Sequence, residues 1–89
     1  MNWMTFKDGT RIEIAEGASL ANITHTAKND ALAVWVTEKC TDDNVSHITF
    51  SQPGEDGAVV VTGEYDNLAL AGDPVRDDNV VTISLKEEA

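Results

Sequence analysis

Turn-forming residues recur so often along this chain that its apolar residues fall into short, patterned runs. Asp8-Gly9, Glu16–Ser19, Pro53–Gly57 and Gly72–Pro74 carry the Gly, Pro and Asp residues that favour turns. No run between them approaches about 18 apolar residues, the length of a membrane-spanning helix. The 89 residues therefore predict a single α+β domain, 1–89, with one helix packed on a mostly antiparallel sheet in the order β-β-α-β-β-β-β.

The N-terminal segment carries a hairpin signal. Met4–Lys7 and Arg11–Ile14 alternate apolar and polar residues on either side of Asp8-Gly9. Asp-Gly suits a two-residue turn, because both central positions of that turn need φ above zero. We expect two antiparallel strands, followed by Leu20 and Ile23 anchoring the next connection on the core.

The segment Asn29–Cys40 is the predicted helix. Asn29 or Asp30 can cap its first turn, and Lys39 places a cation near its C-terminal end. The apolar stripe at helical spacing consists of Leu32, Trp35, Val36 and Cys40. This stripe predicts that Trp35 is a core residue. A strand over Leu32–Thr37 is the competing interpretation, because β-branched and aromatic residues favour sheets.

The second half of the chain reads as strands. The predicted strands are His47–Ser51, Ala58–Thr62, Leu68–Ala71 and Val80–Leu85. Ala58–Thr62 is apolar and β-branched, so we expect it to be central in the sheet. Gly63–Asp66 is expected to break or bulge a strand, and Lys86–Ala89 to be a frayed tail.

Charge limits the partners that this chain can take. Sixteen acidic residues against six basic ones give a net charge of −10, and the acids are spread along the sequence. The folded surface should therefore be negative nearly everywhere and repel phosphates at long range. We expect no direct nucleic-acid binding and no membrane partner. One cysteine, Cys40, and no visible signal peptide point to a reducing cytoplasm.

The sequence predicts no catalytic residue, no cofactor and no metal site. His25 and His47 match no metal-ligand spacing with Asp42 or Asp43. Cys40 lies at a predicted helix C-terminus among acids, which disfavours a thiolate. The acidic pairs Asp42-Asp43, Glu55-Asp56 and Asp77-Asp78 lack the alternating pattern of a calcium loop and are expected to be solvated surface.

The predicted contacts with a protein partner are few. They are Trp3, Asp42, Asp43, Asp77 and Asp78. Trp3 is a large aromatic near a terminus, where it could anchor a partner or fold back on its own domain.

Several segments together resemble a family of small acidic proteins encoded in phages and prophages of Firmicutes. Phe6–Ile14 with Glu16–Leu20 resembles the opening of those proteins. Cys40–Val45 stands where they carry Leu-Thr-x-x-Asn-Leu, and departs from it at its first and last residues. Tyr65–Leu70 and Val81–Lys86 resemble their final portion. These motifs are structural and carry no chemistry.

The resemblance implies a setting near phage tail and baseplate genes. Combined with the acidic composition, it predicts a non-enzymatic protein–protein interaction or assembly protein, namely a phage tail or baseplate accessory component. The alternative is an acidic phage-encoded inhibitor that mimics phosphate and occupies a host nucleic-acid-binding defence protein. Either would be found in the bacterial cytoplasm or on the virion, bound to a protein partner or to itself.

Overall fold

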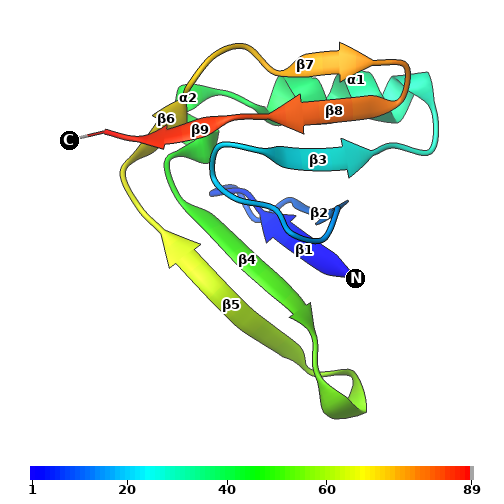
Figure 1. The fold of residues 1–89 in the computed structure, drawn as a ribbon, viewed down its shortest axis with the longest axis vertical. Coiled ribbons are helices and arrows are strands. Elements are labelled where there is room, and N and C mark those ends of the chain that lie inside the picture. The colour runs from blue at the N-terminus through cyan, green and yellow to red at the C-terminus, as the bar shows by residue number, and fades with distance from the viewer. Residues whose placement is uncertain (89) are drawn as a thin grey trace.

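The chain opens with the predicted hairpin, in which β1 (Asn2–Thr5) and β2 (Arg11–Ile14) pair antiparallel (Figure 1). Gly9 adopts a φ of 92°, and its N–H donates to the Phe6 carbonyl oxygen at 3.0 Å. Asp8 is not among the residues with positive φ, so the loop is not the two-residue turn that the sequence predicts. Glycine is needed at one position of this loop because an L side chain would be strained at that φ.

The hairpin continues into a four-stranded sheet with the order β2-β1-β4-β5. Strand β4 (Ile48–Pro53) pairs with β1 only over Thr49–Ser51, whereas β5 (Val59–Tyr65) pairs with β4 to its end. The register shifts where β5 contains one extra residue, Thr62. The far end of the β4–β5 hairpin therefore projects beyond the body, with the short 3-10 helix η1 (Glu55–Gly57) at its tip (Figure 1).

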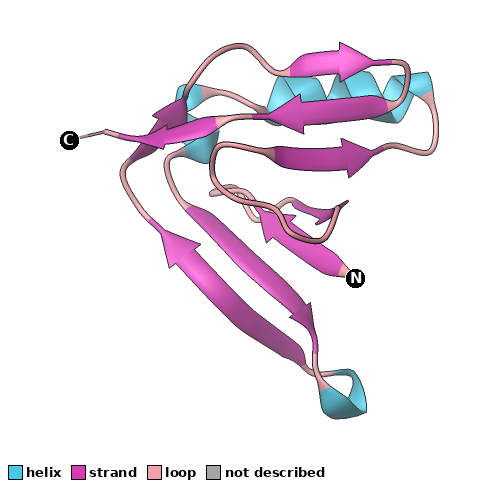
Figure 2. Ribbon diagram, viewed as in Figure 1, coloured by secondary structure: helices cyan, strands magenta, loops and turns pink. Residues whose placement is uncertain are grey.

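Two smaller antiparallel sheets complete the strands of residues 1–88, the part of the chain that the computed structural model describes. One has the order β3-β8-β7, from β3 (Ile23–Thr26), β8 (Val80–Ile83) and β7 (Val75–Asp77). The other pairs β6 (Leu68–Leu70) with β9 (Leu85–Glu87). Figure 2 shows how far strands outweigh helices.

The predicted helix is present as α1 (Asp30–Lys39), and a short helix α2 (Asp42–Val45) follows it. The Asn29 side chain accepts a hydrogen bond from a first-turn N–H of α1, and Thr41 does the same for α2. In Figure 1, α1 runs behind the sheet of β7 and β8, and it contacts β8. The helical interpretation of this segment is thus confirmed over the strand.

One core joins the three sheets to both helices. Its largest fully buried side chains are Met4, Phe6, Ile23, Val36, Val45, Ile48, Val81 and Ile83. Helix α1 and a mostly antiparallel set of strands share this core, which confirms the predicted α+β class.

The observed element order contains more strands than the predicted one. Strands β3 and β7 are additions, and the predicted strand Val80–Leu85 is divided between β8 and β9. The expectation of a frayed tail is wrong for Lys86 and Glu87, which pair with β6. The Glu88 N–H also bonds the Asn67 carbonyl oxygen, while Ala89 lies outside the described residues.

Two predictions of burial are wrong. Trp35 is 42% exposed. Helix α1 turns Ala33 and Val36 toward the core, and Trp35 lies beside this buried side of the helix rather than on it. Ala58–Thr62 is not central, because β5 is the outermost strand of its sheet. The predicted bulge near Gly63–Asp66 falls at Thr62, one residue earlier.

Candidate functional site

The β4–β5 hairpin, Ile48–Tyr65, carries three consecutive exposed valines and is called the arm below. Val59, Val60 and Val61 on its outer strand are 53%, 43% and 55% exposed. Side chains alternate across a strand, so these valines offer apolar surface on both faces of the arm. Strand β5 also has a free edge, whose backbone groups can pair with another strand.

Pairing register places Trp3 on the same face as part of the arm. Trp3 lies opposite Ser51, and Ser51 lies opposite Val61, so the three side chains project from one face of the sheet. Ser51 is only 4% exposed, because the larger side chains of Trp3 and Val61 lie on either side of it. Val59 lies two residues before Val61 and shares this face, which is called the outer face below.

Trp3 is near the N-terminus, but it is held in place by strand pairing and by a contact with Arg11. Trp3 is a half-buried residue of β1, and the Arg11 guanidinium carbon lies 4.2 Å from the centroid of its ring. Such a cation–π contact holds both side chains against the sheet. Trp3 is therefore a fixed part of the outer face.

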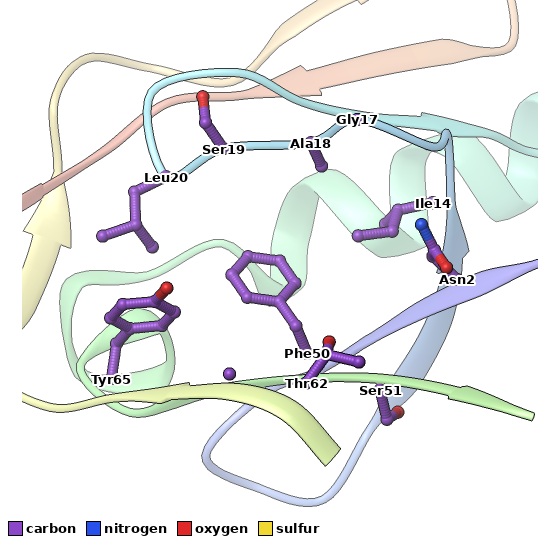
Figure 3. A pocket seen from close by; sticks show the side chains of 11 residues that line it. Asn2, Ile14, Gly17, Ala18, Ser19, Leu20, Phe50, Ser51, Thr62 and Tyr65 are labelled. Atoms are coloured by element: carbon purple, nitrogen blue, oxygen red, sulfur yellow. The ribbon is translucent and has the colours of Figure 1, made fainter. Parts of the chain in front are cut away.

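A cavity of about 220 Å³ lies on the other face of the sheet, at the base of the arm (Figure 3). Phe50 and Tyr65 meet edge to face with ring centroids 5.8 Å apart, and Leu20 and Ile14 lie nearby. No lining residue carries a charge, although the chain as a whole is strongly acidic. The base of the arm thus offers an uncharged, partly aromatic hollow behind the outer face.

His47 fastens the base of the arm. It precedes β4, and its ring nitrogens lie against two carboxylates, Glu64 on β5 (3.2 Å) and Asp66 just after it. The hydrogen bond to Asp66 raises the pKa of His47, and the charges of Asp66 and Glu64 act in the same direction. Protonated His47 therefore links the beginning of β4 to the end of β5.

The other predicted contact residues lie on elements that do not contribute to the outer face. Asp42 and Asp43 are on α2, where the Asp42 carboxylate accepts the Leu70 N–H and Asp43 pairs with Lys7 at 3.2 Å. These bonds give both residues a structural role between elements. They do not form one site with Trp3.

Asp77 and Asp78 lie at the turn between β7 and β8, at the opposite end of that sheet from α2 in Figure 1. Asp78 adopts a φ of 52°, and its carbonyl oxygen accepts a bond from the Arg76 side chain. Both carboxylates are exposed to solvent. The structure therefore distributes the five predicted contacts over three separate places.

Cys40 is buried, as a structural cysteine should be. Its thiol donates to the Val36 carbonyl oxygen at 3.4 Å, and burial raises its pKa to about 11. A thiol with so high a pKa is a poor nucleophile near neutral pH.

Within residues 1–88, no cluster of three or more His, Cys, Asp or Glu side chains is arranged to hold a metal ion. Over the same residues, no helix is long and apolar enough to cross a membrane.

Sequence reasoning missed the three valines of the arm as functional candidates. Their signal was visible as the apolar run Ala58–Val61 after Gly57. Such a run is also typical of a strand buried on both faces, which is how it was interpreted. Only the sheet order distinguishes an edge strand from a central one.

No protein-family model, curated protein or solved structure matches this chain. The resemblance to phage proteins therefore stays a prediction that rests on the sequence segments alone.

Proposed function

We propose that this chain is a non-enzymatic protein–protein interaction module, and that the arm and the outer face are its binding element. The observation that carries the proposal is the run of three exposed valines on a free strand edge in a chain of net charge −10. Exposed apolar patches of this kind on small domains mark interaction sites. An extended partner segment could pair with the β5 edge while its side chains contact Val59 and Val61. Trp3 lies two strands further in and would be covered by another part of the partner.

The sequence resemblance suggests where such a module would act. We propose an accessory or assembly role in a phage tail or baseplate. Trp3 and Arg11 support a binding role for the outer face, because Trp and Arg are enriched among residues that dominate interface energies.

The test compares two valine variants that differ in position. Val61→Lys places a charge on the arm, whereas Val75→Lys places one on β7, where the wild-type valine is 63% exposed. Each tagged protein is mixed with the structural proteins of a virion of the proposed phage, and the proteins that it retains are identified by mass spectrometry. We expect wild type and Val75→Lys to retain the same virion protein and Val61→Lys to lose it.

Two other results would count against the proposal. Equal retention by Val61→Lys would show that the arm is not the binding element. Salt-sensitive binding of a basic nucleic-acid-binding protein, weakened by neutralising Asp77 and Asp78, would favour the phosphate-mimicking inhibitor instead.

A further inference from the structure

A second groove lies away from the arm, between the outer strands of two sheets. Strand β2 is the outer strand of the arm sheet, and β3 is the outer strand of the β3-β8-β7 sheet. They are joined where the Ala15 N–H bonds the Thr24 carbonyl oxygen at 2.8 Å, and the His25 ring contacts the Glu13 carbonyl oxygen. Beyond these bonds a groove of about 290 Å³ lies between the two strands, beside α1.

The α1 side of this groove is apolar and open to solvent. Leu32 and Trp35 line it and are 40% and 42% exposed, while Val36 beneath them is buried. Neither large side chain is needed to fill the core. Their exposure on one side of a groove provides an apolar surface that a ligand side chain could cover.

The charge of the groove differs from that of the rest of the surface. It is lined by two of the six Lys and Arg residues, Arg11 and Lys28, but by only one of the sixteen acids, Glu13. The Lys39 ammonium also lies 5.4 Å from the centroid of the Trp35 ring. The groove is therefore a basic region on an otherwise acidic molecule.

The two cations that line the groove also lack carboxylate partners. Over residues 1–88, Lys7, Lys39 and Arg76 form ion pairs with Asp43, Asp8 and Asp30. The remaining cations are Arg11, Lys28 and Lys86, of which the first two line the groove. Unpaired cations in so acidic a chain favour a negatively charged ligand.

We propose that this groove binds an extended, acidic peptide segment of a partner protein. An apolar side chain of the peptide would cover Trp35 and Leu32, and its carboxylates would lie near Lys28 and Arg11. The groove lies between two outer strands, a position that suits an extended backbone. The groove contains no residue of the arm, but it shares Arg11 with the outer face, where the guanidinium contacts Trp3. Lys28 and Trp35 belong to the groove alone, so variants at these positions test it separately from the proposed function.

The experiment uses two synthetic peptides of equal length, one alternating Asp and Leu and the other alternating Asn and Leu. Binding to the full chain is followed by NMR at about 0.15 M salt, where a Debye length of about 8 Å screens the long-range repulsion between the acidic chain and the acidic peptide. The signals are those of the Trp35 indole N–H and the backbone amides of Arg11–Glu13 and Thr26–Lys28. We expect shifts confined to these positions, with the Asn peptide binding about tenfold more weakly.

Matched variants test the role of charge. Lys28→Gln should weaken binding of the acidic peptide about twofold to fivefold, the effect of one exposed charge pair. Lys86→Gln removes the remaining unpaired cation elsewhere and should leave binding unchanged. Val61→Lys on the arm should also bind the peptide normally, which separates this site from the proposed binding element.

Three results would overturn the proposal. They are the absence of shifts, equal affinity for the two peptides, and equal loss of affinity in Lys28→Gln and Lys86→Gln. A dimer in analytical ultracentrifugation that Lys28→Gln dissociates would also overturn it, because the occupant would then be a second copy of the chain.

Discussion

His47 is the residue whose protonation most directly affects the structure. Its pKa is raised in the folded state by the bond to Asp66, so protonated His47 stabilises the fold at pH values below its unfolded pKa of 6.5. This stabilisation is lost as the pH rises through the folded pKa. We expect the free energy of unfolding to decrease by less than about 1 kcal/mol over the pH interval that begins near 6.5 and extends through the folded pKa of His47.

Urea melts at several pH values measure this dependence. His47→Gln should flatten it, because glutamine does not titrate. Glu55→Gln, which neutralises an acid at the distant tip of the arm, should keep the slope of the wild type. A wild-type protein whose stability increases over this interval would contradict the assignment.

Cys40 should react slowly while the chain is folded. Burial raises its pKa to about 11, so the thiolate is scarce near pH 7. Labelling by a thiol reagent should speed up greatly in denaturant, where Cys40 is exposed and its pKa is ordinary. Rapid labelling of the folded protein, monitored by mass spectrometry, would show that the thiol is accessible and activated.

At the scale of elements, α1 has one side that packs on the core and another that is exposed to solvent. Val36→Ala should decrease the free energy of unfolding by about 2 kcal/mol, because it leaves a cavity in the core. Trp35→Gln should change it by less than about 1 kcal/mol, since the ring is exposed. Chemical denaturation of both variants checks the comparison, and a larger loss for Trp35→Gln would place that ring in the core.

The arm should open more readily than the body. Its outer part is supported by only one neighbouring strand, and Val59–Val61 bury little apolar surface. Amide hydrogens that β5 donates to β4 should therefore exchange faster than those of Val81 and Ile83, which lie in the core. Hydrogen exchange followed by NMR tests this, and equal protection would mean that the arm opens only with the whole molecule.

Local signals in the sequence predicted where helices and strands lie better than they predicted which other elements pair with them or cover them. Asn29 and the spacing of α1 located the helix, because capping and periodicity act within a few residues. Strand β3 was missed because it is short and is stabilised by pairing with β8, which is distant in the sequence. Strand β7 was missed because its three residues, Val75–Asp77, are all exposed and show no apolar alternation.

The candidate sites depended on information that the sequence does not hold. Trp35 and Val61 are apolar residues that could equally well be buried. Trp35 is exposed because the core packs against another side of α1, and Val61 is exposed because β5 is the outermost strand of its sheet. Trp3 was predicted as a contact from its chemistry alone. Its alignment with Ser51 and Val61 follows from pairing across three strands, which only the fold provides.

At the scale of the whole molecule, charge repulsion should oppose folding. The net charge is −10, and within residues 1–88 Lys–Asp or Arg–Asp ion pairs involve only three of the sixteen acidic side chains. Raising the salt concentration to about 0.15 M shortens the Debye length to about 8 Å and weakens this repulsion. We expect a small increase in thermal stability with added sodium chloride.

Asp77→Asn together with Asp78→Asn should reproduce part of that increase, because asparagine tolerates the positive φ of Asp78. Calorimetry at low and moderate salt measures both effects. A steady decrease of stability with salt would show that attractive pairs outweigh the repulsion.

The free valine edge of β5 has a consequence for solubility. Exposed apolar strand edges can pair with the same edge of another copy and nucleate intermolecular sheets. Repulsion between like-charged copies slows this association. Acidification below about pH 5 would protonate carboxylates and remove this protection. Fibrils should then form from the arm first, and Val60→Lys should lengthen the lag before thioflavin fluorescence rises.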